Sequence, residues 1–227
     1  SGREAGYVSF LADAFEATKA VAPDIPVALG GLAYVDLEPN FRLAFLDDLL
    51  AAGAGPFFDV LSYHWFPDVS GQQVSGPEKL GLIRSPPARH DLEKHVWLTE
   101  TYKLVQVNAP VAGQKAQLVH LTRDLVTLLG RPELERVYWF GVIDYPPRHK
   151  WRADLADRGL VTHDHRLRAA AAVVPFVTAF TNGVPDDIST DRVVAWRFTW
   201  PGDGHSHVIA WPRNGGAAVL RIPASDG

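Results

Sequence analysis

Up to about residue 182, short apolar runs alternate with segments that carry an apolar side chain at every third or fourth position. The apolar runs are continuous, which is typical of strands that helices cover on a sheet. These runs lie at 25–31, 57–66, 95–101 and 137–143. The segments with helical periodicity lie at 6–22, 41–50, 118–130 and 166–180. The pattern therefore predicts one helix followed by four strand–helix units.

The spacing of the expected strands favours parallel pairing. They begin near residues 25, 57, 95 and 136, so successive starts are 32, 38 and 41 residues apart, enough for right-handed crossover connections. Two α/β architectures fit this order, an open doubly wound sheet or part of a (β/α)8 barrel. The dinucleotide-binding spacing G-x-G-x-x-G is absent, which makes the open sheet the weaker choice. We expect four strands of a barrel.

Two proline-rich segments complete this first part. The prolines between residues 67 and 94 predict a loop with one short helix, and Pro175 predicts a kink in the helix expected from about residue 166.

Beyond about residue 188 the period of the pattern changes to two. Val194, Trp196, Phe198 and Trp200 alternate with their neighbours, and glycine-rich turns lead into runs at 207–211 and 217–222. This pattern predicts an antiparallel meander of three strands, which either leans on the barrel or belongs to a partial β-sandwich. We therefore expect a partial barrel over 1–185 and a β-rich appendage over 186–227.

Composition excludes several classes of protein. The chain is 47% hydrophobic and 21% charged with a formal charge of −4, which is ordinary for a soluble globular protein and disfavours a nucleic-acid partner. No apolar run reaches the ~18–20 residues of a membrane helix. Cysteine is absent, so disulfides and thiolate metal sites are excluded. Methionine is also absent, even at position 1, so we expect the native start to lie upstream. The compartment and the oligomeric state stay open.

The run 95–101 ends in a carboxylate. Glu100 follows the apolar and β-branched residues Trp97, Leu98 and Thr99. In parallel α/β folds, side chains at the carboxyl ends of strands converge on one mouth, where active sites form. The alternative is a glutamate that only begins a solvated loop, and its position alone does not separate the two.

Several motifs together resemble one enzyme class. The sequence Trp97-Leu98-Thr99-Glu100-Thr101 resembles strand 7 of the retaining glycoside hydrolases of clan A, whose catalytic glutamates stand on strands 4 and 7. Further segments resemble the same barrels in the expected order over residues 6–182. They are residues 27–31 (strand 5), 62–66 (strand 6), 138–144 (strand 8) and 159–161 (the barrel's close). Within the clan, the sequence resembles most the group around family 39, which contains β-xylosidases and iduronidases.

The resemblance implies that Glu100 is the nucleophile of a retaining glycosidase. Retention requires a second carboxyl group about 5–5.5 Å away, which acts as acid and then as base. In this clan that residue follows an asparagine on strand 4, and no Asn-Glu pair occurs in the 227 residues. Glu4 lies too near the start of the first helix to fill the role. We expect the acid/base upstream of residue 1, and this chain alone to be inactive.

The resemblance also suggests residues that bind substrate. His64 is implied to contact the nucleophile or a sugar hydroxyl, although a core histidine is nearly as good an interpretation. Trp139 offers a flat face for a sugar ring, with strand packing as the alternative. Asp144 lies at the same rim, where it could bind hydroxyl groups.

No cofactor or metal is expected. His163-Asp164-His165 lies in a polar turn without a third ligand at a recognisable spacing, and H-E-x-x-H is absent. The predicted function is therefore hydrolysis of O-glycosidic bonds in a carbohydrate substrate. A non-catalytic carbohydrate-binding relative of the barrel enzymes is the alternative, and an open-sheet enzyme of another class is a weaker third.

Overall fold

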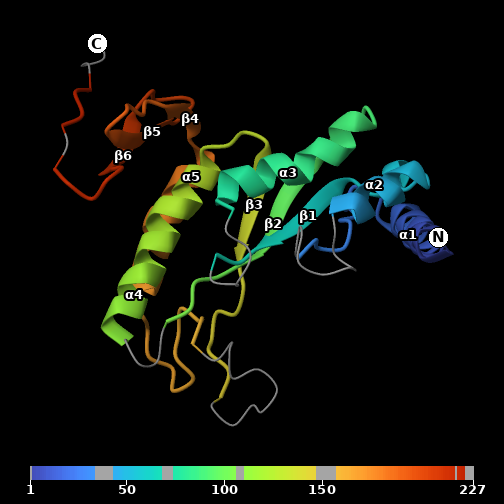
Figure 1. Cartoon of the computed structure of the whole chain (residues 1–227), viewed down its shortest axis with the longest axis horizontal. Helices are drawn as coiled ribbons and strands as arrows, with labels where there is room; N and C mark the ends of the chain where they lie inside the picture. Colours follow the sequence, from blue (N-terminus) through green and yellow to red (C-terminus); the bar gives the residue numbers. More distant parts are fainter. Residues whose placement is uncertain are drawn as a thin grey trace.

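The structure is a computed structural model that describes residues 2–33, 43–67, 74–105, 110–146, 157–217 and 219–222. It contains parallel strands flanked by helices, followed by an antiparallel sheet (Figure 1). The helices are α1 (Gly2–Val21), α2 (Leu43–Ala51), α3 (Gly76–Arg89), α4 (Pro110–Val119), α5 (Leu125–Leu129) and α6 (Val174–Ala179). The strands are β1 (Val60–Trp65), β2 (His95–Thr101), β3 (Leu134–Trp139), β4 (Val184–Asp187), β5 (Val193–Thr199) and β6 (Ser206–Pro212).

The parallel sheet follows the order of the chain. Its strands lie in the order β1-β2-β3, and both pairs are parallel. Residues 27–32 run parallel to β1 on its other side, where Leu29 N–H donates to the Val60 carbonyl at 2.9 Å and His64 N–H donates to the Leu32 carbonyl at 3.0 Å. The expected first strand is thus present as isolated bridges. A sheet that runs in one direction is consistent with a barrel segment, and one half of a doubly wound sheet has the same order.

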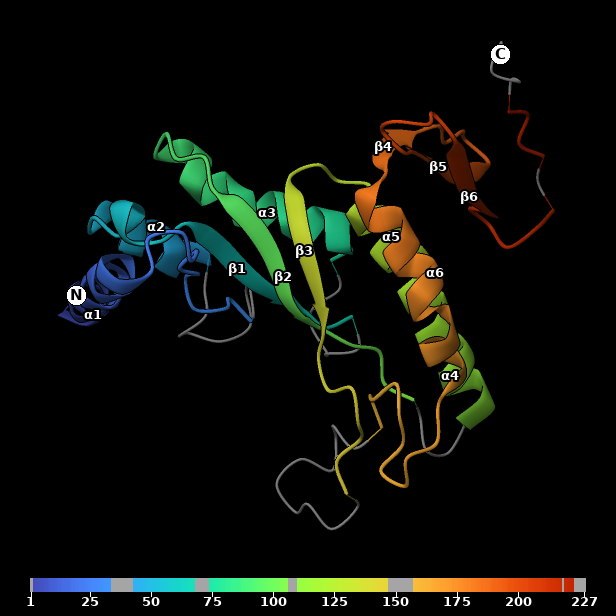
Figure 2. The same cartoon turned by 180° about the vertical axis from the view of Figure 1, so that it is seen from behind.

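One face of this sheet is packed against helices. Leu61 and Tyr63 of β1 pair with Val96 and Leu98 of β2, and all four are buried. They belong to one apolar core with residues of α2, α3 and α5. Figure 2 shows the opposite face, across which no helix of the described part of the chain runs.

A β-bulge changes which face the end of β2 presents. Tyr63 pairs with Leu98, but the next residue, His64, pairs with Glu100, so Thr99 is an extra residue in β2. The β2–β3 register shifts at the same place. The Thr99 hydroxyl donates to the Tyr63 carbonyl at 3.2 Å. Because side chains alternate along a strand, one extra residue moves Glu100 from the helix-covered face to the open face.

The strand β3 begins earlier than expected. The sequence predicts a strand over 137–143, whereas the structure has it over Leu134–Trp139. Its first half includes Glu135 and Arg136, both exposed, which hid the strand from a search for apolar runs.

The helix α3 is longer than its prolines predict. Ser75 begins it with a capping box, in which Ser75 Oγ accepts from the Glu78 N–H and Glu78 accepts from the Ser75 N–H. Pro86 and Pro87 lie inside its last turns and are buried. The expectation that these prolines break the segment is wrong, because the prolines pack against the core while the helix continues to Arg89.

The next helical segment, from Pro110 to Leu129, contains a turn of π-helix. Between α4 and α5, residues His120–Asp124 adopt the π form without a break in the segment. Such turns are rare and occur often at functional sites. The apolar positions that predicted this helix, such as Leu121 and Leu125, do point into the core.

After the parallel part, a short helix leads into the antiparallel sheet. Residues Ala169–Val173 are 3-10 helix, and α6 begins at Val174 with Pro175 in its first turn, where proline is tolerated. The sheet has the order β4-β5-β6. Two of its strands, β5 and β6, were expected from the sequence, but β4 was not. The third expected strand is missing, because the described residues near 217–222 form no strand. Pro185 in β4 occupies an edge strand, where a missing N–H is tolerated. The expected division at residue 185 falls inside β4.

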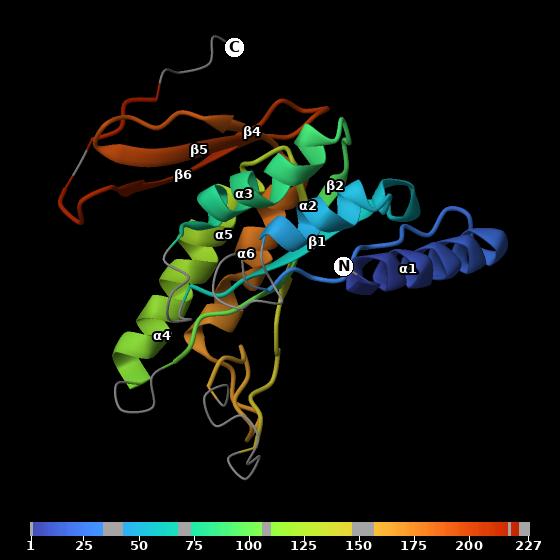
Figure 3. The ribbon, with the colours of Figure 1, turned by 45° about the vertical axis from the view of Figure 1, so that its right-hand side comes forward.

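The antiparallel sheet leans on the parallel part, beside α5 and away from α1 (Figure 3). Phe180, after α6, lies with its ring centroid 4.8 Å from that of Phe198 in β5. The indole of Trp196 lies against Gly130, where an added Cβ would be 2.5 Å from the ring. Trp196 and Phe198 belong to the same core cluster as the parallel strands.

The described helices include none that is long and apolar enough to cross a membrane.

Gly130→Ala tests this junction. The added methyl group collides with Trp196, so we expect the free energy of unfolding to fall by about 1–3 kcal/mol in denaturant titrations. Gly81→Ala is the matched control, because nothing lies within 4 Å of its added Cβ on α3. That change should stabilise the helix by up to about 1 kcal/mol. Equal effects of the two substitutions would contradict the packing described.

Candidate active site

Glu100 and His64 meet at the carboxyl ends of neighbouring strands. They are paired in the β1–β2 register, and His64 Nδ1 lies 3.5 Å from Glu100 Oε2. Their side chains retain 17% and 30% exposure, so both are mostly buried but reachable. The structure thus brings together two of the residues that the sequence selected.

The imidazole of His64 rests directly on Gly31. A Cβ on Gly31 would lie 2.2 Å from His64 Nε2, a distance no side chain can accept. Glycine at the end of the 27–32 segment is therefore required for the ring to stand beside Glu100. This close approach, rather than phosphate binding, accounts for the second glycine of Gly30-Gly31.

The surroundings keep His64 neutral. Burial, with the charge of Lys79 as a second cause, lowers the pKa of His64 from its usual 6.5 to about 4. Lys79 is fully buried on α3 and donates from Nζ to the Ala33 carbonyl at 2.8 Å. Neutral imidazole keeps one N–H donor, which Nδ1 can direct at the carboxylate.

The carboxyl group of Glu100 is subject to two opposing effects. Burial raises the pKa of Glu100, and the positive charge of Arg158 works against that increase by favouring the carboxylate. A partly desolvated carboxylate beside one cation is a better nucleophile or base than a solvated one, because water no longer stabilises its charge fully.

Three aromatic residues form a row beside this pair. Phe66, Tyr102 and Phe140 each follow the last residue of a parallel strand, β1, β2 and β3 in turn. Ring centroids are 4.7 Å apart for Phe66 and Tyr102 and 6.4 Å apart for Tyr102 and Phe140. The sequence analysis missed this row, although one aromatic side chain directly after each strand is a signal that the sequence contains.

A hydrogen-bonded chain supports β2 from the helix side. The buried His120, in the π turn, has Nε2 3.2 Å from Thr101 Oγ1 and Nδ1 2.8 Å from Asp124 Oδ2. Thr101 follows Glu100, so these hydrogen bonds fix the end of the strand that carries the carboxylate. The sequence analysis missed it as well, since His120 lies among apolar helix positions and its partners are far away or one turn on.

Trp139 packs both on the helix side of the sheet and against the cluster of Phe66 and Tyr102 at the strand ends. It pairs with Thr101 in the β2–β3 register and therefore shares the helix-covered face. Its ring centroid is 5.9 Å from that of His120, and its indole N–H donates to the Arg158 carbonyl at 3.3 Å. These contacts show how Trp139 is packed, and its contact with a sugar ring stays a prediction.

Asp144 is also a structural residue here. It is buried, its Oδ2 forms an ion pair with Arg168, and its Oδ1 accepts from the Gly159 N–H at 2.6 Å. With both oxygens bound by protein donors, the carboxylate has little capacity left for a sugar hydroxyl.

The histidines at 163 and 165 lie in a turn. Asp164 between them pairs with Arg166 Nε at 2.8 Å and accepts from Thr162 Oγ1 at 2.5 Å. Among the residues that the structure describes, no group of three or more His, Cys, Asp or Glu side chains is arranged to hold a metal ion.

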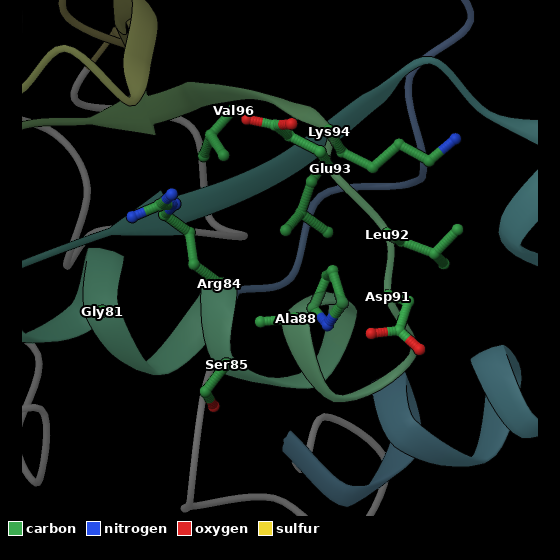
Figure 4. Close-up of a pocket in the computed structure, with 11 residues that line it drawn as sticks. Gly81, Arg84, Ser85, Ala88, Asp91, Leu92, Glu93, Lys94 and Val96 are labelled. Carbon is green, nitrogen blue, oxygen red and sulfur yellow. The ribbon is translucent and has the colours of Figure 1, made fainter.

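A separate pocket of about 460 Å³ lies at the other end of β2. Arg84 of α3 and Lys94, directly before β2, are among the side chains around it (Figure 4). Because active sites of parallel folds lie at the carboxyl ends of strands, this pocket is not the candidate site.

Titration of His64 tests the electrostatics of the site. We expect an apparent pKa of about 4 by NMR, with the signal assigned through a His64→Asn variant. Since the unfolded chain takes up this proton near pH 6.5, His64 also lowers the free energy of unfolding as the pH falls from about 6.5 to about 4. A titration midpoint at or above pH 6 would contradict the burial described.

Comparisons with solved structures identify the fold. A glycoside hydrolase family 2 β-galacturonidase from Eisenbergiella tayi, solved with galacturonate, matches with a TM-score of 0.55 and 16% identity over 75% of this chain and 30% of that one. A family 39 β-xylosidase from Caulobacter crescentus matches with a TM-score of 0.55 and 13% identity over 85% and 42%. A β-glucuronidase from Lactobacillus rhamnosus matches with a TM-score of 0.52 and 15% identity over 78% and 29%.

The chain therefore spans less than half the length of these three structures. No protein-family profile and no curated protein sequence matches it. The resemblance to clan A glycoside hydrolases that the motifs predict is confirmed in structure, and it includes a family 39 enzyme. Over most of its length, this chain has the fold of part of a clan A glycoside hydrolase.

Proposed function

We propose that this chain carries the nucleophile of a retaining glycoside hydrolase and that Glu100 is that nucleophile. The observation that supports this most strongly is the bulge in β2, which aims a partly buried carboxylate at the open face, beside a neutral histidine. Strand ends in this part of a parallel fold are where catalytic groups stand. The four parallel segments correspond in this proposal to strands 5–8 of the barrel.

The reaction proceeds by two displacements. An oxygen of Glu100 attacks the anomeric carbon, the bond to the leaving oxygen breaks, and a glycosyl ester forms on the carboxylate. Water then attacks the same carbon and releases Glu100, which restores the original configuration. His64 donates its N–H to the carboxylate, which fixes the direction from which the attacking oxygen approaches the sugar.

A second carboxyl group must protonate the leaving oxygen. In the described part of the chain, Glu100 lies beside the neutral His64 and is acted on by the charge of Arg158, and neither side chain is a carboxylic acid. The sequence has no Asn-Glu pair. We assign the acid/base to residues of the complete protein outside these 227, and the chain by itself should not hydrolyse glycosides that need protonation to leave.

The sugar ring has aromatic surfaces to pack against. Tyr102 and Phe140 lie at the strand ends on the side of Arg158, and Phe140 is only partly buried. We assign to Phe140 the stacking role that the sequence gave to Trp139, because an aromatic face beside the site favours the apolar side of a sugar.

The alternative function is carbohydrate binding without cleavage. The observation that favours it is the same lack of a second carboxyl group beside Glu100 in the described residues. A complete protein whose other residues supply no such group would bind sugars and leave them intact.

Glu100→Gln in the complete protein tests the assignment. The amide cannot form the glycosyl ester, so we expect kcat for an aryl glycoside to fall by about 10³-fold or more while the melting temperature stays close to that of wild type. Glu93→Gln, two residues before the other end of the same strand, is the control and should keep normal turnover. Near-normal hydrolysis by the Glu100→Gln enzyme would refute the nucleophile.

A further inference from the structure

Arg158 is a buried cation without a complete set of partners. Its side chain is among the largest fully buried ones, with 1% exposure. Within the part of the chain that the structure describes, neither its Nε nor its Nη1 has a hydrogen-bond partner. An unsatisfied, buried, charged donor is costly, and such groups in proteins usually have a reason that lies in function.

Arg168 differs from Arg158 in having carboxylate partners, although its own Nε also lacks a hydrogen-bond partner among the described residues. Arg168 is also buried, at 7% exposure, and its guanidinium forms ion pairs with Asp144 and, at 3.3 Å, with Asp157. Arg158 instead has aromatic neighbours. Its guanidinium carbon lies 4.2 Å from the ring centre of Phe140, 5.0 Å from that of Tyr145 and 5.3 Å from that of Tyr102.

Aromatic rings stabilise the charge of the guanidinium, but they do not accept the hydrogen bonds that its N–H groups donate in the plane of the guanidinium. A guanidinium between ring faces therefore keeps its edge free for an acceptor that lies in its own plane. The acceptor that matches a guanidinium best is a carboxylate, which takes two parallel, charge-assisted hydrogen bonds. The three rings hold Arg158 ready for such a group.

The backbone beneath Arg158 is fixed by buried hydrogen bonds. Its carbonyl accepts from Gln117 Nε2 at 3.1 Å and from the Trp139 indole at 3.3 Å. The next residue, Gly159, donates to Asp144 at 2.6 Å, and its carbonyl accepts a further bond from Gln117 at 3.1 Å. A side chain on so rigid a support loses little freedom when it binds a ligand, which favours affinity.

Arg158 also lies close enough to Glu100 for its charge to act on that carboxylate. Tyr145, whose ring centre lies 5.0 Å from the guanidinium carbon, is 40% exposed, so the aromatic cage around Arg158 reaches the protein surface.

We propose that Arg158 binds the carboxylate of a uronic acid, so that the enzyme cleaves uronosyl rather than neutral glycosides. The proposal rests on the function proposed for Glu100 and adds the class of sugar. Tyr102, Phe140 and Tyr145 position the guanidinium, and the substrate supplies the acceptor that the protein lacks.

The test compares matched substrates in the complete enzyme. Aryl glucuronides and galacturonides are set against the aryl glucoside and galactoside of the same anomeric configuration. We expect kcat/KM for the preferred uronide to exceed that for its neutral counterpart by about 100-fold, because a buried unpaired charge rejects a ligand that lacks its partner. The ratio cancels any general effect on Glu100.

Arg158→Met should lower this preference by about 100-fold, and Arg158→Lys should restore part of it because the charge returns without the planar fork. Arg84→Met, an exposed arginine on α3, is the control and should leave the preference unchanged. A folded Arg158→Met enzyme that loses both activities equally would assign Arg158 to Glu100 alone and overturn the proposal.

Two further results separate this proposal from the glycosidase function. A wild-type enzyme that cleaves neutral glycosides but not uronides would overturn the uronate site and leave Glu100 as the nucleophile. If no aryl glycoside is cleaved, the glycosidase function fails, and calorimetric binding of free glucuronate and galacturonate decides on the site. Binding that Arg158→Met abolishes would support it, and no binding to the wild type would overturn it.

Discussion

The extra residue in β2 determines how the whole site is arranged. Before the bulge, Val96 and Leu98 face the helices, and after it Thr101 does so, which leaves Glu100 on the open face. If Thr99 paired regularly instead of forming the bulge, Glu100 would share the face of Leu98 and have to enter an apolar core, where an unpaired carboxylate is very costly. Two hydrogen bonds hold this local geometry. One joins Thr101 to His120 on the helix side, and the other joins Thr99 to the Tyr63 carbonyl of the neighbouring strand β1.

Within the described residues, the charged groups of the site, Glu100 and Arg158, lack some of the partners that charged groups usually have when they are buried. His64 is kept neutral by burial and by Lys79, so it offers Glu100 a hydrogen bond without neutralising it. Arg158 favours the carboxylate form of Glu100 while its own Nε and Nη1 stay without partners. A site of this kind is less stable than one with matched ions, and it gains from a substrate that supplies the missing interactions. Asp144 and Arg168, which form an ion pair with each other, belong to the supporting structure instead.

The features that could be predicted from sequence are those that depend on local pattern. Continuous apolar runs predicted β1 and β2. Glu100 and His64 were selected as candidate site residues because each lies at or near the end of one of these runs. The start of β3 was predicted too late, because the charged residues Glu135 and Arg136 interrupt the apolar pattern there. The structural contacts of Asp144 and Arg158 could not be predicted from sequence, since their partners come from other segments of the chain.

The most direct measurement is to trap the covalent intermediate on the complete protein. The substrate is a dinitrophenyl glycoside of a fluorosugar. Its dinitrophenolate group leaves without protonation, so the first displacement depends on the nucleophile and not on the acid. The fluorine slows hydrolysis of the glycosyl ester, so the intermediate accumulates. Mass spectrometry of the digested protein should place the sugar on the peptide that contains Glu100, and the Glu100→Gln protein should stay unlabelled. A sugar attached to any other carboxylate would contradict the account.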